Sequence, residues 1–273
     1  MSLTLRFERF PAPGGLLRVA SVPWDSQHFG FPFFQVRCEE VPLDRLAMEL
    51  ASWLSTLPRD RACFVHTTLP ASRLSRAGAL IANRFYPVET FYEARLELAP
   101  FARSCNPKWE GAQLREATEA DLPRLRELSG AAFSSLRLHL DTNLSREGAD
   151  RRMRQWIENS FRAGERVLAY DQRLTGETIG LITYRRTEPT VAYFSLTAIE
   201  RSRQSAGFVV PMFEAALRDC AEQGYQTATL RISSNNRGSL NLATSLGFRV
   251  DNAVMGFHWF RPAPPADTGS FQT

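Results

Sequence analysis

The sequence has few cysteines, a single lysine and no long hydrophobic run. Its four cysteines are scattered over 273 residues without Cys-x-x-Cys spacing, which argues against a disulfide framework or a zinc site. No stretch reaches the roughly 18 apolar residues that a membrane-spanning helix needs. The first fifteen residues alternate polar and apolar side chains, unlike a signal peptide. We therefore expect a cytoplasmic protein with reduced cysteines, no bound metal and no membrane partner.

The positive charge is almost entirely arginine. The formal net charge is +4 and the pI about 9.1, yet Lys108 is the only lysine among 33 basic residues. Basic residues are interleaved with acidic ones, and in the densest stretch, 151–166, the apolar residues recur at helical spacing. This pattern is typical of a solvated helix face. Nucleic acid is therefore not an expected partner.

The composition is that of an average globular protein, with 44% hydrophobic and 23% charged residues. A chain of 273 residues can form one large or two ordinary domains. Residues 99–110 are rich in proline, glycine and polar side chains, which predicts a linker. We predict an N-terminal α/β domain at 1–105, which is acceptor-binding or a relative of the second domain. The second domain is predicted at 106–262 and a mobile tail at 263–273.

Hydrophobic periodicity predicts an α/β fold with a mixed sheet and helices on its faces. In the first half, β-prone and helical stretches alternate. In the second half, two helices precede a hairpin, and strands and helices then alternate. The predicted strands are 16–22, 31–38, 62–69, 90–98, 166–171, 178–186, 191–199, 227–233 and 253–260, and the helices are 43–57, 71–85, 117–133, 153–161, 208–224 and 236–247. Thr118 and Asp121 have the spacing of an acidic capping box.

The junction after strand 191–199 has the composition of an anion site. Arg201 and Arg203 precede Gly207, which stands where the next helix begins. Backbone N–H groups and the helix dipole favour anions at such a position, and a glycine lets a phosphate approach the backbone. The alternative is an ordinary glycine-bearing turn between a strand and a helix.

The order of elements and two motifs resemble the GNAT acetyltransferase superfamily. The first is the family's Q/R-x-x-G-x-G/A pyrophosphate loop, matched at Gln204 and Gly207, with Val209 in place of the last small residue. The second is N-x-x-A-x-x-x-Y-x-x-x-G-F, matched from Asn236 to Phe248. The resemblance implies a GNAT fold that uses acetyl-CoA or another acyl-CoA as co-substrate. The residues expected to contact it are Leu196, Thr197, Ala198 and Ile199 through their backbone, then Arg203, Gln204, Ser205, Ala206, Gly207, Phe208 and Val209, and finally Asn236 and Ser239.

The expected acid and base residues are few. Many family members have a tyrosine that protonates the departing thiolate, and Ala243 occupies that position here. Tyr193, on the preceding strand, is a candidate for this acid function. His139 and Asp141 are candidates for the acceptor side, where a neutral imidazole can take a proton near pH 7; the alternative for both is an ordinary polar loop. No His, Asp or Glu cluster has metal-ligand spacing.

Three further segments resemble bacterial sugar-nucleotide amine N-acetyltransferases, such as those that act on dTDP-fucosamine. They are W-D-S-x-x-F-G at 24–30, AAFSSLRL at 131–138 and QWIENS at 155–160. This resemblance implies direct transfer of an acetyl group to the amine of a nucleotide-linked amino sugar or similar small metabolite. One alternative is altered chemistry, with a longer acyl donor, a hydroxyl acceptor or thioester decarboxylation, because Ala243 replaces the tyrosine. Another is a non-catalytic protein that binds CoA or an interaction partner. The sequence leaves open whether the chain forms a homodimer.

Overall fold

The computed structural model describes residues 5–11, 15–102, 111–132, 136–204 and 207–264. These residues form two compact units, an N-terminal unit within Thr4–Glu89 and Val254–Thr273 and a C-terminal unit within Thr90–Ala253. The predicted division at residue 105 does not coincide with this split, because residues 91–97 pair with residues 227–233. The predicted fold class, a mixed sheet with helices on its faces, is confirmed. Of the predicted tail at 263–273, residues 265–273 lie outside the described residues.

The C-terminal unit is built on a sheet in the order β5-β10-β9-β8-β7-β6. β9 and β10 are parallel, and the other neighbouring strands are antiparallel. β8 is buried along its first seven residues, as expected for a strand covered on both faces. The strands are β5 (Tyr86–Glu97), β6 (Ala112–Glu116), β7 (Arg166–Gln172), β8 (Thr178–Glu188), β9 (Val191–Ile199) and β10 (Thr227–Ser233).

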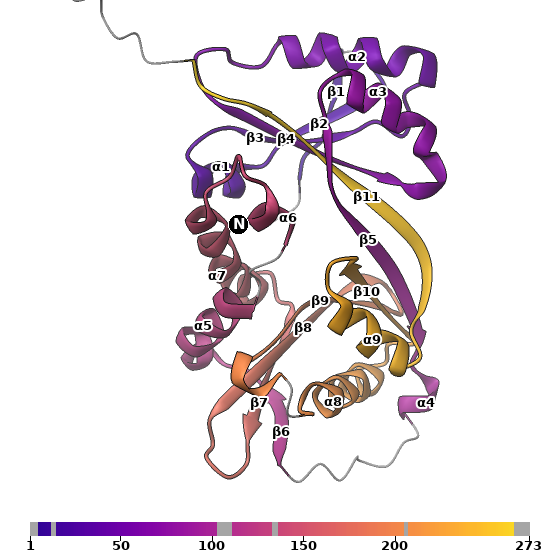
Figure 1. Ribbon diagram of the computed structural model, residues 1–273. Coiled ribbons are helices and arrows are strands. Elements are labelled where there is room, and N and C mark those ends of the chain that lie inside the picture. The colour runs from indigo at the N-terminus through magenta and orange to yellow at the C-terminus, as the bar shows by residue number, and fades with distance from the viewer. Residues whose placement is uncertain (1–4, 12–14, 103–110, 133–135, 205–206, 265–273) are drawn as a thin grey trace, which may run out of the picture. The chain divides into compact units, whose positions relative to one another are not determined.

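Helices cover both faces of this sheet (Figure 1). α8 and α9 pack on one face, where Phe213 and Leu246 join Phe194 in a hydrophobic cluster. α5 and α7 pack on the other face through Leu125 and Ile157. The helical segments are α4 (Ala99–Ala102), η2 (Glu119–Asp121), α5 (Leu122–Ala132), α6 (Arg137–Leu140), α7 (Arg146–Arg162), η3 (Arg201–Arg203), α8 (Val209–Glu222) and α9 (Arg237–Ser245).

The helix predicted at 117–133 is present with Thr118 as its N-cap, but a strand before it was missed. Residues 112–116 form β6, which pairs antiparallel with β7. The capping box follows, with the Thr118 N–H donating to Asp121 Oδ2 at 2.7 Å. α5 begins only at Leu122, after a short 3₁₀ turn. The sheet partner of β6 is more than fifty residues away, so local periodicity cannot reveal this strand.

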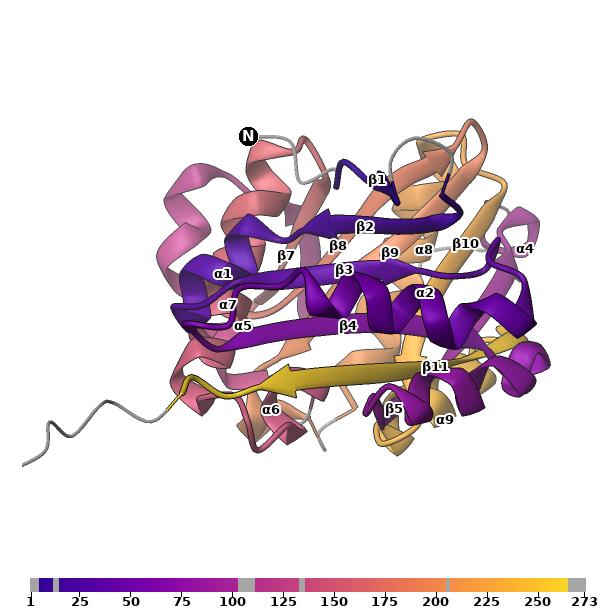
Figure 2. The ribbon, with the colours of Figure 1, turned by 90° about the horizontal axis from the view of Figure 1, so that it is seen from above.

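The N-terminal unit has a sheet in the order β1-β2-β3-β4-β11, in which β3 and β4 are parallel. Figure 2 shows α2 lying over these strands. α2 buries Leu46, Leu50 and Trp53 against the sheet, at the spacing of one helix face. The elements are β1 (Glu8–Phe10), β2 (Leu17–Ser21), α1 (Pro23–Phe29), β3 (Phe33–Arg37), α2 (Leu43–Ser55), β4 (Cys63–Pro70), η1 (Ala71–Arg76), α3 (Ala77–Ala82) and β11 (Arg249–Arg261). α1 and β1 were not predicted.

The N-terminal unit repeats part of the connectivity of the C-terminal unit. Apart from α1, which lies between β2 and β3, and the 3₁₀ turns, the series β2-β3-α2-β4-α3 has the same strand directions as β8-β9-α8-β10-α9. The strand that follows each series pairs with a strand of the other series. β5, which follows α3, pairs with β10, and β11, which follows α9, pairs with β4. This exchange explains why residues 254–261, at the end of the chain, belong to the N-terminal unit.

Three of the four cysteines lie in the described residues, and all three are buried free thiols: Cys38, Cys63 and Cys220. Burial raises the pKa of the Cys38 thiol to about 11 and that of Cys220 to about 12. Both thiols therefore stay protonated near neutral pH and act as core side chains, as the sequence predicted.

Candidate functional site

The parallel strands β9 and β10 part within the C-terminal unit. They pair from Val191 opposite Thr227 to Phe194 opposite Leu230. Beyond this point β9 continues along β8, and β10 continues along β5. The segment 195–199 thus has a backbone edge without a β10 partner among the described residues. Leu196, Thr197, Ala198 and Ile199, which were predicted to contact the co-substrate through their backbone, all lie on this segment.

A β-bulge lies where the two strands part. Phe194 is opposite Tyr184 of β8 and Leu196 is opposite Thr183, so Ser195 is an extra residue in β9. The bulge changes the face on which the following side chains lie. Phe194 stacks on Phe213 of α8 at 5.4 Å between ring centroids, whereas Leu196 packs with the α5 and α7 side chains.

The loop after β9 leads into the N-terminus of α8, a helix of 14 residues. Gly207 has a φ of +78°, and a Cβ at this position would have no atom within 4 Å. The open space beside Gly207 and the dipole of α8 suit a phosphate group. Phe208 is buried against Ile199 and Met212, which fixes the start of α8 on the sheet. Ser205 and Ala206, also predicted to contact the co-substrate, lie outside the described residues.

Glu200 anchors the beginning of this loop. Its carboxylate lies 3.0 Å from Arg124 Nη2 of α5 and 3.9 Å from Arg203 Nε. Its N–H donates to the carbonyl of Ile179, and Gln204 Nε2 donates to the carbonyl of Ile199 at 3.4 Å. The predicted residues Arg203 and Gln204 are therefore both at the C-terminal end of β9, beside Gly207 and Val209.

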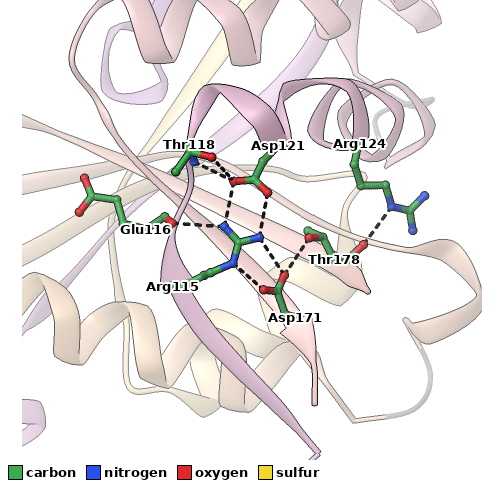
Figure 3. Close-up of polar contacts among 7 residues, drawn as sticks. All are labelled: Arg115, Glu116, Thr118, Asp121, Arg124, Asp171 and Thr178. Carbon is green, nitrogen blue, oxygen red and sulfur yellow. Dashed lines mark hydrogen bonds and ion pairs between the residues drawn. The ribbon is translucent and has the colours of Figure 1, made fainter. Parts of the chain in front are cut away.

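An arginine-centred network supports the helix that carries Arg124. Figure 3 shows the Arg115 guanidinium between the carboxylates of Asp121 and Asp171. Its nitrogens lie 2.8 Å from both Asp121 oxygens and 2.5 Å from Asp171 Oδ2, and Thr178 Oγ1 donates to Asp171 at 2.7 Å. The Arg115 hydrogen bonds hold the pKa of the Asp121 carboxyl well below its usual range.

Replacement of Arg115 by glutamine is expected to lower the free energy of unfolding by about 2 kcal/mol near pH 7. This is less than for a fully buried pair, because the Arg115 side chain is 37% exposed. A depressed carboxyl pKa stabilises the fold above the unfolded-state value of about 4, and this contribution is lost as the pH falls below it. Urea unfolding of wild type and R115Q should therefore differ most near neutral pH and converge in acid.

The neighbouring turn offers a control for this variant. Arg173 Nε reaches only the Ala112 carbonyl, at 3.5 Å, and R173Q should change the free energy of unfolding by less than about 0.5 kcal/mol. An equal loss of stability in R115Q and R173Q at every pH would contradict the role of the network.

Asn236 and Ser239 lie at the start of α9, just after the C-terminal end of β10. Asn236 Oδ1 accepts a hydrogen bond from the Ser239 N–H at 3.0 Å and so caps the helix. The cap uses the side-chain oxygen, which leaves the Asn236 Nδ2 group as the part able to donate to a ligand. Both predicted residues therefore follow the strand that parts from β9.

Ala243 lies in the hydrophobic core. It is 5% exposed, and with Leu246 of α9 it belongs to the cluster that includes Phe194, Phe213 and Leu230. A tyrosine ring at this position would have to displace these core side chains.

Tyr193 lies beside the bulge with three polar neighbours. The Arg185 guanidinium is 5.3 Å from the centroid of its ring. Arg185 Nε is also 3.6 Å from Glu165 Oε1, and Ser195 Oγ donates to Glu165 Oε2 at 3.1 Å. Burial raises the pKa of Tyr193, so its phenol keeps its proton at neutral pH. Sequence reasoning missed Glu165, which follows α7 in a short turn and has no motif around it.

His139 and Asp141 belong to α6 and the turn that follows it. His139 Nε2 lies 3.1 Å from Asp150 Oδ1 of α7. Asp141 Oδ1 accepts hydrogen bonds from the Asn143 N–H at 2.9 Å and from Asn143 Nδ2 at 3.0 Å. These contacts give both residues local structural roles, and their part in acid–base chemistry stays a prediction.

The equivalent loop of the N-terminal unit differs from the one at Gly207. Residues 38–42, between β3 and α2, include two glutamates and no glycine. Arg76 Nη1 donates to the carbonyls of Cys38 at 3.0 Å and Val41 at 2.7 Å. Negative side chains disfavour an anion, and the arginine is already bonded to the loop itself. The candidate phosphate site therefore belongs to the C-terminal unit.

The described ranges contain neither a metal-binding cluster nor a membrane-spanning helix. No group of three or more His, Cys, Asp or Glu side chains in these ranges is arranged to hold a metal ion. None of the helices there is long and apolar enough to cross a membrane.

A family model of the acetyltransferase (GNAT) domain matches residues 112–249, which is half of the chain. The chain belongs to the GNAT acetyltransferase family. The matched region begins with β6 and includes the parted strands, the Gly207 loop and α9. The protein is therefore an acyltransferase, and membership of the family implies that this GNAT domain binds acetyl-CoA. A search of curated proteins found no match.

Solved GNAT structures share the fold over most of this chain. A GCN5-related N-acetyltransferase from Sphaerobacter thermophilus is 14% identical with a TM-score of 0.65, covering 93% of this chain and 79% of that one. A GCN5-related N-acetyltransferase from Kribbella flavida is 12% identical with a TM-score of 0.61, covering 97% of this chain and 91% of that one. A tandem GNAT protein from the clavulanic acid biosynthesis pathway is 16% identical with a TM-score of 0.58, covering 92% of this chain and 79% of that one. At these identities the likeness shows the fold alone.

Proposed function

We propose that this GNAT acyltransferase moves an acetyl group from acetyl-CoA to the amine of a nucleotide-linked amino sugar. The observation that carries the proposal is the parting of β9 from β10 at Phe194 and Leu230, which leads directly to the Gly207 loop. The first feature offers backbone groups to an extended ligand, and the second offers a site for its phosphates.

The spacing between these two features fits one elongated co-substrate. From Ser195 to Ile199 the strand rises about 13 Å, at about 3.3 Å per residue. A pantetheine arm can lie along this edge and bond to its amides while its diphosphate lies at the N-terminus of α8. Arg203 and Arg201 are then placed to attract the phosphates, and Asn236 is placed to donate to the arm from α9. The thioester would lie near Ser195.

The residues near Ser195 suit the chemistry of acyl transfer. An attacking amine forms a C–N bond and places negative charge on the thioester oxygen, which backbone N–H groups can stabilise. The departing thiolate needs a proton. Tyr193 can supply it, because burial keeps its phenol protonated at neutral pH.

The proposed acceptor rests on the sequence resemblance to dTDP-fucosamine N-acetyltransferases. Two of the three segments that carry this resemblance lie entirely within the described residues. Trp24–Gly30 covers most of α1, and Gln155–Ser160 lies in α7. In the third, residues 133–135 lie outside the described part of the chain, and Leu136–Leu138 leads into α6. Ser26 accepts from the Phe33 N–H at 2.9 Å, so part of the first segment has a structural role.

Release of free CoA thiol from acetyl-CoA tests this function. We expect rapid release with dTDP-fucosamine and slow release with glucosamine, which has the amine but no nucleotide. Release with neither amine, nor with other primary amines, would contradict the proposal. Thermal stabilisation by CoA without turnover of any thioester would then favour a non-catalytic binding protein. Faster turnover of a longer acyl-CoA would favour the altered donor.

A further inference from the structure

Glu165, Ser195 and Ser160 form a hydrogen-bonded group at the bulge of β9. Ser195 Oγ donates to Glu165 Oε2 at 3.1 Å, and Ser160 Oγ of α7 donates to the same oxygen at 2.9 Å. The Glu165 side chain is 10% exposed. We propose that Ser195 and Glu165 act as a proton relay that accepts the proton of the attacking amine. This inference rests on the proposed acetyl transfer.

The position of Ser195 makes it the relay's entry point. Ser195 is the extra residue of the bulge, immediately beyond the last residue of β9 that pairs with β10. The Ser195 hydroxyl donates to Glu165, so its oxygen lone pairs remain the acceptor sites for a third group. An amine that attacks the thioester near Ser195 can therefore hydrogen-bond to Ser195 Oγ, and it needs no direct contact with Glu165.

The proton and electron changes of the step balance. The amine nitrogen forms a bond to the thioester carbon, and its N–H proton passes to Ser195 Oγ. The Ser195 proton passes to Glu165 Oε2, so the serine is unchanged and the carboxylate becomes neutral. The C–S bond then breaks, the thiolate takes a proton from Tyr193 or water, and Glu165 and Tyr193 re-equilibrate with solvent.

The polar groups that face Glu165 come from three elements, β8, β9 and α7. Arg185 of β8 lies 3.6 Å from Glu165 Oε1 and also faces the Tyr193 ring. Tyr193 of β9 is within electrostatic range of Glu165, Glu93 and Arg231. Ser160 of α7 is uncharged. Arg185 is 52% exposed, so solvent screens its charge.

S195A, E165Q and the double variant test for a relay as opposed to a structural role. S195A and E165Q each interrupt the proposed path, and we expect each to lower kcat by about 30-fold near pH 7. The KM for acetyl-CoA should change by less than about twofold, because the co-substrate contacts are retained. The loss should shrink toward about pH 10, where hydroxide can take the proton instead. The kcat of the double variant should be no more than about threefold lower than that of either single variant.

S160A is the matched control. It also removes one hydrogen bond to Glu165 Oε2, but Ser160 lies on α7 and outside the proposed path. We expect its kcat, measured with acetyl-CoA and dTDP-fucosamine, to fall by less than about threefold, because one hydrogen bond to Glu165 is lost while the path through Ser195 stays intact. If S160A and S195A show the same kcat loss and the same pH profile, the relay is overturned. Full activity of S195A or E165Q overturns it as well. An inactive wild type overturns the proposed function and the relay with it.

Discussion

The Gly207→Val variant is expected to bind acetyl-CoA about 100-fold more weakly than wild type, a loss of about 2.7 kcal/mol. Gly207 has a φ of +78° at the start of α8, and open space surrounds the position of its missing Cβ. A valine there would strain the backbone and place two methyl groups where the diphosphate is expected to approach. Isothermal titration with acetyl-CoA measures the loss directly.

Gly176 is a matched control for backbone strain. It has a φ of +69°, and its Cβ position is also open, but it lies in the turn between β7 and β8. Each substitution should cost about 1–2 kcal/mol of stability, because both place a branched residue at positive φ. Only Gly207→Val should weaken acetyl-CoA binding. Equal affinities of the two variants would contradict the placement of the diphosphate at α8.

The Ala243→Tyr variant is expected to destabilise the protein rather than restore a catalytic acid. Ala243 is 5% exposed in the cluster between α9, α8 and the sheet. Inserting a ring into a packed core costs about 3 kcal/mol. This corresponds to a fall in Tm of roughly 6–12 °C at this chain length. Thermal unfolding followed by circular dichroism measures the change, and thiol release should not become faster.

Asn241→Tyr places the same ring on the exposed side of α9 and should alter stability by less than about 0.5 kcal/mol. If A243Y were as stable as N241Y and turned over acetyl-CoA faster than wild type, residue 243 would face the thioester. The account of Ala243 as a core residue would then be wrong.

The sequence was sufficient to predict the elements that carry the proposed co-substrate site. The β-branched run at 191–199 predicted β9, and the glycine after it predicted the start of α8, because both signals are local. Thr118 and Asp121 likewise have the spacing of a capping box, and the structure contains one. Asn236 and Ser239 were predicted from a motif that runs from Asn236 to Phe248, and the two residues lie within one turn of α9.

Other features depend on residues far apart in the chain. β6 is only five residues long, and its pairing with the distant strand β7 is what identifies it as a strand. The exchange of β5 and β11 leaves no local signal, so the predicted boundary at residue 105 followed the proline-rich segment instead. The bulge at Ser195 depends on the register with β8, and it brings Ser195 to Glu165, thirty residues earlier. No periodicity in the sequence encodes that contact.

Titration of the intact wild-type protein with acetyl-CoA tests the central claim most directly. The account predicts saturable binding of one acetyl-CoA per chain, because only the C-terminal unit has the Gly207 loop. It also predicts that the 100-fold loss in Gly207→Val appears in the same experiment. Binding of two molecules per chain, or binding that Gly207→Val leaves unchanged, would contradict the assignment of the site. Absence of binding by the wild type would contradict the account as a whole.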